Sequence, residues 1–373
     1  MTFKVPFVNY SLQYKNLEKE IDSAIKDVLS RGDLILREDV ERFEKGLASF
    51  LGAKYAVGVN SGTDALIFSL KAAGVGPGDE VITVSHTFAA SITCVFHVGA
   101  TPVLIEVKED FTMDPKEVEK AVTSKTKAIL PVHYNGRTCD MEKIMDIAKK
   151  HNLAVIEDSA QSLGAKFNNK NAGTFGSASC YSFYPAKILG SAGDAGAVIT
   201  DDENIAQKIR LYRNHCQRKN AEGKVEFLCF GETSRLHNLQ AAILNVKLKY
   251  VSSWIERRRG IAKIYQNRLA SVKGIKLPPA PDSDSKYFDV FQNYVLQAEK
   301  RDELSSFLKE NGVETLIKDP IANHLQPAFN LSHFKLSFSE KLADKVISLP
   351  MYPELNNEQV EYAAQKVCDF YKQ

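Results

Sequence analysis

The chain has 373 residues, of which 44% are hydrophobic and 25% are charged, so it can bury a sizeable core, and global disorder is excluded. Lysine and arginine number 48 against 46 aspartates and glutamates, and this balance argues against a nucleic-acid binder, which usually carries a strong basic excess. No apolar run approaches the ~18 residues that cross a bilayer, and the amino-terminal segment lacks the apolar core of a signal peptide, so we expect no membrane association.

The cysteines are spread over the whole chain and form no C-x-x-C pair. They are Cys94, Cys139, Cys180, Cys216, Cys229 and Cys368. This distribution is typical of free thiols in a reducing compartment, and not of a disulfide framework or a zinc site. The histidines form no close ligand cluster either, so we expect no metal site and a cytoplasmic protein.

Short apolar runs rich in β-branched residues alternate with helical patterns through the first two thirds of the chain. Strands are predicted at residues 55–59, 80–84, 102–107, 127–133, 153–158, 178–184 and 196–200. Several of these runs are continuously apolar, which is typical of strands buried on both faces of a parallel sheet. Helical patterns lie between them at 63–73, 114–122, 140–151 and 204–213. The βαβα order predicts a doubly wound α/β sheet.

The last third of the chain is predicted to form a smaller α+β domain. One long helix is expected at 239–269 because no proline interrupts it, and a loop rich in proline, aspartate and serine follows at 276–287. Beyond that loop we expect a strand at 288–297, a helix at 300–311, a strand at 312–318 and a final helix from residue 357. The charged run 256–259 is expected to be a solvated helix face, with a nucleotide-phosphate contact as the alternative.

Ligands of open α/β sheets bind beyond the carboxyl ends of the strands. The predicted strand 55–59 is followed by Ser61, Gly62 and Thr63 and then at once by a helix. Backbone N–H groups at such a helix start suit a phosphate. Taken alone, however, the segment is better explained as a plain helix cap made by Ser61 or Thr63.

Two further strand ends carry charged residues. Asp158 ends the strand 153–158 and can hold a positive partner, or can simply cap the next helix, and Gln161 follows three residues later. Lys187 comes after a proline turn and before a glycine-rich return into the next strand, which argues against an ordinary surface lysine. A phosphate cradle, an aspartate and a lysine so placed are what pyridoxal 5′-phosphate (PLP) requires, because the lysine bonds to the aldehyde and the aspartate keeps the ring nitrogen protonated.

The chain resembles the DegT/DnrJ/EryC1/StrS family of nucleotide-sugar aminotransferases from about residue 5 to residue 355. The matching stretches are NSGTDAL (60–66), GPGDEVI (76–82), TFAAS (87–91), VIEDSAQSLGA (155–165), SFYPAKILG (182–190), GDAGAVIT (193–200) and SRLHNLQAAIL (234–244). The resemblance implies a fold-type I PLP-dependent transferase, with a mainly parallel seven-stranded sheet in a large α/β/α domain. This PLP-binding domain would span 10–245, and a small α+β domain at 246–373 would be completed by residues 1–9.

The resemblance also implies roles for individual residues. Lys187 would be the Schiff-base lysine and proton shuttle, Asp158 would pair with the ring nitrogen, and Gln161 would contact the phenolic oxygen. Phe88 would stack on the ring face. Contacts with the phosphate are assigned to Gly62, Thr63 and Ser182.

Other positions concern the substrate and a second subunit. Thr233 stands where relatives carry an asparagine that reaches the neighbouring subunit's phosphate, so a hydroxyl would have to make that contact. Arg235 would lie near the partner's active site, where it could meet a donor carboxylate. Lys318 and His324 are expected to bind substrate, although the family's Tyr-Pro beside Lys318 is replaced here by Asp319-Pro320. A homodimer with shared active sites is therefore expected.

The implied reaction moves an amino group from L-glutamate to a keto group of a UDP- or dTDP-linked sugar, for lipopolysaccharide O-antigen or another surface glycan. The segment 234–244 resembles the 3-amino members of the family more closely, so C3 is favoured over C4. Some members replace the lysine and are dehydratases, and the presence of Lys187 favours transamination over that alternative. A regulatory sensor and a non-enzymatic binding module are the remaining alternatives.

Overall fold

The computed structural model describes residues 3–372, and its largest feature is a seven-stranded sheet of order β1-β9-β8-β5-β4-β2-β3. The strands are β1 (Tyr55–Val59), β2 (Glu80–Val84), β3 (Thr101–Ile105), β4 (Thr126–Ile129), β5 (Ala154–Asp158), β8 (Ala178–Ser182) and β9 (Gly196–Thr200). Neighbouring strands are parallel except at β9, which runs antiparallel to both β1 and β8. The prediction of a mainly parallel, seven-stranded sheet is confirmed.

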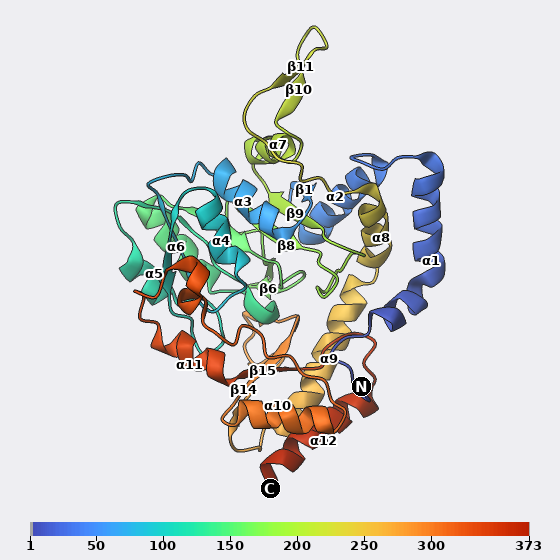
Figure 1. The fold of residues 1–373 in the computed structure, drawn as a ribbon, viewed down its shortest axis with the longest axis vertical. Coiled ribbons are helices and arrows are strands. Elements are labelled where there is room, and N and C mark those ends of the chain that lie inside the picture. Colours follow the sequence, from blue (N-terminus) through green and yellow to red (C-terminus); the bar gives the residue numbers. More distant parts are fainter. Residues whose placement is uncertain (1–2, 373) are drawn as a thin grey trace.

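Apolar cores lie on both faces of this sheet, because successive side chains of a strand point to opposite sides. In β1, Ala56 packs into one core and Val57 into the other, and in β9 Ile199 and Val198 divide in the same way. Helices cover both faces (Figure 1). They are α2 (Glu38–Leu51) and α8 (Asn238–Leu248) in one core, and α3 (Gly62–Ala72), α4 (Ala90–His97), α5 (Pro115–Ala121), α6 (Met141–His151) and α7 (Glu203–Tyr212) in the other.

The amino-terminal helices were not predicted from the sequence. Helix α1 (Tyr10–Arg31) packs its buried Leu17 and Ile21 against α8, and α2 follows it. The side chain of Asn9 caps α1 by accepting a hydrogen bond from Leu12 N at 3.0 Å, and left-handed glycines, Gly32 and Gly52, end α1 and α2. Capping residues and terminal glycines mark helix ends in a sequence, so the sequence did carry a signal for these two helices.

The single helix predicted at 239–269 is wrong, because the structure has two helices there. Helix α8 ends at Leu248 and α9 (Val251–Leu269) begins after a break at Lys249 and Tyr250. Neither proline nor glycine marks the break, so the sequence offered no local signal for it. The expectation of a solvated face at 256–259 is also wrong for Arg258 and Arg259, which are only 4% and 5% exposed.

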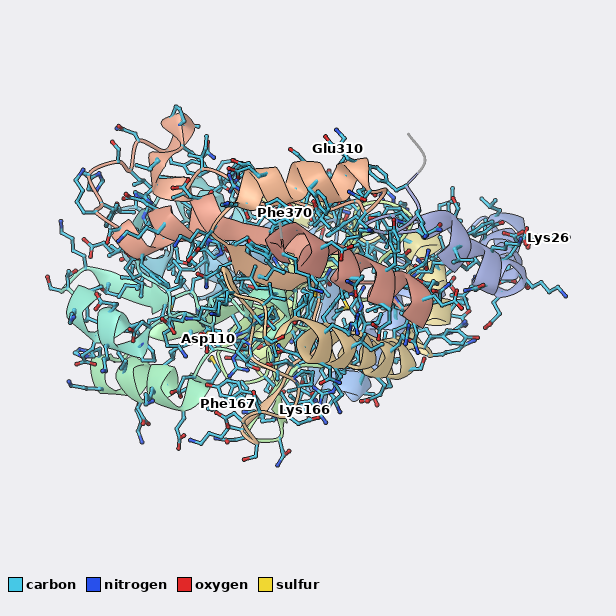
Figure 2. The ribbon with its side chains drawn as sticks, turned by 90° about the horizontal axis from the view of Figure 1, so that it is seen from below. Lys26, Asp110, Lys166, Phe167, Glu310 and Phe370 are labelled. Carbon is cyan, nitrogen blue, oxygen red and sulfur yellow. A yellow bond between two sulfur atoms is a disulfide. The ribbon has the colours of Figure 1, made fainter. Side chains whose placement is uncertain are left out.

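The C-terminal part is built on a small sheet of order β12-β14-β15, formed by β12 (Ile275–Lys276), β14 (Tyr294–Ala298) and β15 (Val346–Leu349). Helices α10 (Arg301–Glu310) and α12 (Asn357–Lys372) lie side by side (Figure 2), and the rings of Phe307 and Phe370 are 5.6 Å apart. Helix α11 (Ser337–Lys345) and β15 were not predicted. The predicted strand 312–318 forms only isolated bridges, at Val313 and Leu316.

The start of the chain pairs with this C-terminal part. Val5 accepts a hydrogen bond from Glu314 N at 2.9 Å, donates to Gly312 O at 3.0 Å, and forms a parallel bridge with Val313. The pairing is consistent with a small domain completed by the amino-terminal segment, and the boundary at 245/246 stays a prediction. Among the residues that the structure describes, no helix is long and apolar enough to span a bilayer.

A two-stranded hairpin of β10 (Gln217–Lys219) and β11 (Val225–Phe227) projects from the body of the molecule (Figure 1). A disulfide joins Cys216 and Cys229 at its base, with their Cα atoms 5.5 Å apart, so the prediction of free thiols is wrong for this pair. Hairpin pairing brings the two together although they are 13 residues apart in sequence. The remaining short elements are β6 (Lys166–Phe167), β7 (Lys170–Asn171), β13 (Tyr287–Phe288), and 3-10 turns at Tyr134–Gly136, Asn323–Leu325 and Pro327–Phe329.

Candidate active site

A cavity of about 700 Å³ lies at the carboxyl ends of the central strands, where the large sheet meets the amino-terminal segment and the C-terminal part. The residues predicted to bind the cofactor line it, with the exception of Thr233. They are Gly62, Thr63, Phe88, Asp158, Gln161, Ser182 and Lys187. The fold thus collects into one cavity residues that are more than a hundred positions apart in sequence.

The start of helix α3 forms one wall of this cavity. The Ser61 side chain caps the helix by accepting a hydrogen bond from Asp64 N at 3.0 Å. Gly62 packs so closely on β8 that a Cβ there would lie 2.8 Å from Cβ of Ser182. The close approach places the Ser182 hydroxyl beside the first turn of α3, and Thr63 follows on the same turn. Helix N–H groups beside hydroxyls form an anion cradle that suits a phosphate.

Asp158 is held at the end of β5 by two hydrogen bonds. Its Oδ2 accepts from Ser91 Oγ at 2.7 Å, and its Oδ1 accepts from Ala160 N at 3.1 Å. Ser91 is itself hydrogen-bonded to Thr87 Oγ1 at 2.8 Å. Asp158 is 6% exposed and lines the cavity, so the two hydrogen bonds hold its carboxylate in a fixed place there. Such a group can hold a protonated ring nitrogen.

Lys187 lies on the tight turn after β8, where its backbone N–H donates to Tyr184 O at 2.8 Å. Burial, followed by the positive charge of Lys318, lowers the pKa of Lys187 to about 7, while Asp158 and Asp319 act in the opposite direction. An ordinary lysine is almost wholly protonated at neutral pH, with a pKa of about 10.4. A large share of the Lys187 amine is therefore neutral and nucleophilic near pH 7.

Gln161 presents one end of its amide to the cavity. Its Oε1 accepts a hydrogen bond from Asn135 N at 2.9 Å, and Asn293 Nδ2 lies 3.5 Å from the same oxygen. Because the oxygen is engaged by the protein, the Nε2 group is the end left to donate to a ligand. An amide donor is the group that a phenolic oxygen requires.

Lys318 is the one predicted substrate residue that lines the cavity. Its ammonium lies 4.9 Å from the centre of the Tyr134 ring, and the Tyr134 hydroxyl donates to Asp319 at 3.0 Å. Burial lowers the pKa of Lys318. Two amines therefore share one cavity, and the charge of Lys318 disfavours the protonation of Lys187.

Three residues predicted for the site lie outside this cavity. His324 is fully buried, with Nδ1 bonded to Ser85 Oγ at 2.8 Å and Nε2 to Glu340 Oε1 at 3.0 Å, so the geometry does not support a substrate contact. Thr233 bonds to His215 Nε2 at 2.8 Å, and Arg235 Nη1 donates to Asn214 Oδ1 at 3.2 Å. Both stand at the base of the β10–β11 hairpin, away from the cavity of their own chain.

Several cavity residues were missed by the sequence analysis. Ser91 lies within the TFAAS stretch, so its contact with Asp158 belongs to a recognised motif whose geometry the sequence did not reveal. Tyr10, Gln292 and Asn293 also line the cavity, but they come from the amino-terminal helix and the C-terminal part and carry no motif. Arg258 lines it as well, and it belongs to the charged run 256–259, for which a ligand contact was only the alternative interpretation. Only the folded chain brings them to the strand ends.

A family model described as the DegT/DnrJ/EryC1/StrS aminotransferase family matches residues 15–368. The chain belongs to this aminotransferase family. A pleiotropic regulatory protein of Geobacillus stearothermophilus is 43% identical over 99% of this chain and 99% of its own. A dTDP-3-amino-3,4,6-trideoxy-alpha-D-glucose transaminase of Streptomyces venezuelae is 41% identical over 96% of this chain and 94% of its own. A UDP-N-acetyl-3-dehydro-alpha-D-glucosamine 3-aminotransferase of Acidithiobacillus ferrooxidans is 38% identical over 95% of each chain.

Two solved structures superpose closely on this chain. DesV of Streptomyces venezuelae, solved in complex with a ketimine intermediate, has a TM-score of 0.95 and 39% identity and covers 100% of both chains. NtdA of Bacillus subtilis, solved with bound cofactor PMP, has a TM-score of 0.92 and 32% identity, covering 100% of this chain and 86% of its own. The predicted fold-type I class is confirmed by this likeness.

Proposed function

We propose that this chain is a PLP-dependent aminotransferase that moves the amino group of L-glutamate to the C3 keto group of a UDP- or dTDP-linked sugar. The observation that carries the proposal is the Lys187 amine, whose pKa burial lowers to about 7, in one cavity with Asp158 and the start of α3. Family membership supports the same class of reaction.

The residues present fit PLP. The phosphate would be held by Thr63, Ser182 and the N–H groups at the start of α3, where only a glycine at position 62 leaves room beside Ser182. Asp158 would take the ring nitrogen, and the amide of Gln161 would donate to the phenolic oxygen. Phe88, which is 56% exposed and lines the cavity, would cover one face of the ring.

Bound PLP supplies an aldehyde that bonds to amines and a ring that accepts electrons. The chain's own groups do the rest. The neutral Lys187 amine is the nucleophile, and once free it is a base that can take a proton from the donor carbon and return it elsewhere. The hydrogen bonds from Ser91 and Ala160 would hold the Asp158 carboxylate in place opposite the ring nitrogen. The surrounding side chains limit the access of water to Lys187.

The choice of substrate rests on charge and on the relatives. Lys318 and Arg258 bring two cations to a cavity that would receive the carboxylates of glutamate and the diphosphate of a nucleotide sugar. The names of two relatives specify 3-amino sugars, one linked to dTDP and one to UDP, which supports C3. The product would serve the synthesis of a surface glycan such as O-antigen.

The predicted homodimer belongs to the same proposal. Thr233 and Arg235 lie away from their own cavity, at the base of the hairpin. Phe227 on β11 is 70% exposed, and Phe230, just after Cys229, is 93% exposed. An apolar projection of this kind suits contact with a second copy. The cytoplasmic location stays a prediction, and the Cys216–Cys229 disulfide does not fit the free thiols on which it was based.

The direct test is a panel of UDP- and dTDP-linked 3-keto and 4-keto sugars, incubated with glutamate and PLP and analysed by mass spectrometry. We expect products that carry one amino group, from the 3-keto substrates only, and none from the Lys187→Ala variant. Amination of 4-keto sugars alone would overturn the C3 assignment. Loss of water from the sugar without a gain of nitrogen would identify a dehydratase.

A further inference from the structure

Gln292 holds the backbone on both sides of Lys187. Its side-chain Oε1 accepts a hydrogen bond from Ile188 N at 2.8 Å, and its Nε2 donates to Ala186 O at 2.7 Å. The bonded atoms belong to the peptide groups directly before and after the lysine. One side-chain amide therefore fixes both peptide planes from which the Lys187 side chain departs.

Gln292 is itself held in place by the C-terminal part. It is 6% exposed and lies just before β14, in a segment whose carbonyls at Phe291 and Gln292 each accept from Arg258 Nη1 at 3.2 Å. Val290 N donates to Gly136 O at 3.0 Å, and a Cβ at Gly136 would lie 2.8 Å from Gln292 N. With no room to shift, the segment acts as a rigid support for the amide.

The Lys187 amine has no comparable anchor of its own. Within residues 3–372 it makes no hydrogen bond or ion pair to another side chain. The charges that act on it are those of Lys318, Asp158 and Asp319. The other charged or titratable groups that line the cavity are Tyr10, Tyr184, Asp194 and Arg258. The position of the amine among these groups therefore depends on how its backbone is held.

We propose that Gln292 is a positioning residue for Lys187, through which the C-terminal part sets the place of the reactive amine. The proposal rests on the proposed function in one respect, that Lys187 is the reacting group. Loss of the amide leaves the buried N–H of Ile188 and the partly buried carbonyl of Ala186 without these partners, and such groups recruit water or move to find it. The turn then loosens and the Lys187 ammonium gains access to solvent.

The test measures the reactivity of Lys187 in the cofactor-free full chain. Trace acetic anhydride labels amines in their neutral form, and mass spectrometry of the Lys187 peptide across a pH series gives the pKa of that amine. Gln292→Met, which keeps the side-chain length and removes both hydrogen bonds, is expected to raise this pKa by about one unit, which lowers labelling at pH 7 about fivefold. Gln240→Met is the matched control, because Gln240 accepts from Ala192 N at 2.9 Å in the same loop but does not touch the peptide groups of Lys187.

Unchanged labelling of Lys187 in a folded Gln292→Met protein would overturn the proposal, as would an equal change in Gln240→Met. If Gln292→Met does not fold, as judged by circular dichroism, Gln292→Asn takes its place, since the shorter amide cannot reach both peptide groups. If the pKa of Lys187 in Gln292→Asn equals its pKa in the wild type, the proposal is likewise contradicted. The labelling experiment needs neither PLP nor a sugar, so its outcome does not depend on the proposed function. Failure of the proposed function would show in a separate experiment, as the absence of PLP bound to Lys187.

Discussion

At the scale of single residues, the reactivity of Lys187 depends on the second amine in its cavity. Lys318 is among the causes that lower the pKa of Lys187 to about 7. In Lys318→Met the like charge is absent, so the pKa of Lys187 should rise and its neutral fraction at pH 7 should fall. Labelling of Lys187 across a pH series, as above, measures this shift. The exposed Lys341 on α11 provides the control, and a Lys318→Met titration identical to that of Lys341→Met would rule out the interaction.

Ser91 tests whether the placement of Asp158 matters for the cofactor. A hydrogen bond to a charged group contributes about 1.5–3 kcal/mol, so Ser91→Ala should weaken PLP binding roughly tenfold or more. Asp158→Asn should lower turnover by several orders of magnitude, because the ring nitrogen loses its negative partner. PLP affinity measured by equilibrium dialysis, together with turnover, checks both variants. Ser91→Ala binding PLP as tightly as the wild type would show that this hydroxyl does not support the carboxylate.

At the scale of elements, the start of helix α3 requires a residue without a side chain. A Cβ at Gly62 would lie 2.8 Å from Cβ of Ser182, whereas a Cβ at Gly76 meets nothing within 4 Å. Gly62→Ala should therefore destabilise the protein by about 1–3 kcal/mol and weaken PLP binding by moving Ser182. Gly76→Ala should change neither property. Thermal unfolding with and without PLP separates the two effects, and equal behaviour of the two alanine variants would refute the close contact.

The sequence predicted the central strands well, and the helices expected at 63–73, 114–122, 140–151, 204–213 and 300–311 correspond to α3, α5, α6, α7 and α10. It predicted poorly the amino-terminal helices, the break in the long helix and parts of the C-terminal region. The strands at 55–59, 80–84 and 196–200 match β1, β2 and β9 in full, because strands buried on both faces need continuous apolar runs. The break between α8 and α9 is set by tertiary packing and leaves no mark in the sequence. The strand expected at 312–318 fails for a similar reason, since its only pairings are bridges to distant segments.

At the scale of the whole molecule, the position of Arg235 predicts that subunits complement one another. If Arg235 acts in the partner's site, Lys187→Ala and Arg235→Ala should each lose most activity alone. Mixing them after dissociation and reassociation should restore about one quarter of wild-type activity, because half of the dimers are mixed and each then has one complete site. Activity assays of the mixed and unmixed variants provide the measurement. No recovery on mixing, with dimers present, would contradict shared active sites.

The candidate site was predictable where its residues follow strands and unpredictable where they do not. Asp158 ends β5 and Lys187 lies on the turn after the adjacent parallel strand β8, so the fold class alone brings them to the same edge of the sheet. Gln292 and Arg258 reach the same cavity through the packing of the C-terminal part on the sheet, which no local pattern encodes. His324 is a predicted site residue that the fold keeps out of the cavity. Both of its ring nitrogens are hydrogen-bonded, one to Ser85 and the other to Glu340.

The most direct measurement is borohydride reduction of the PLP-loaded protein, followed by peptide mapping. We expect the peptide containing Lys187 to carry the phosphopyridoxyl mass, in a stoichiometry near one per chain, and the Lys187→Ala variant to carry none on any lysine. A protein saturated with PLP whose Lys187 remains unmodified after reduction would contradict the account.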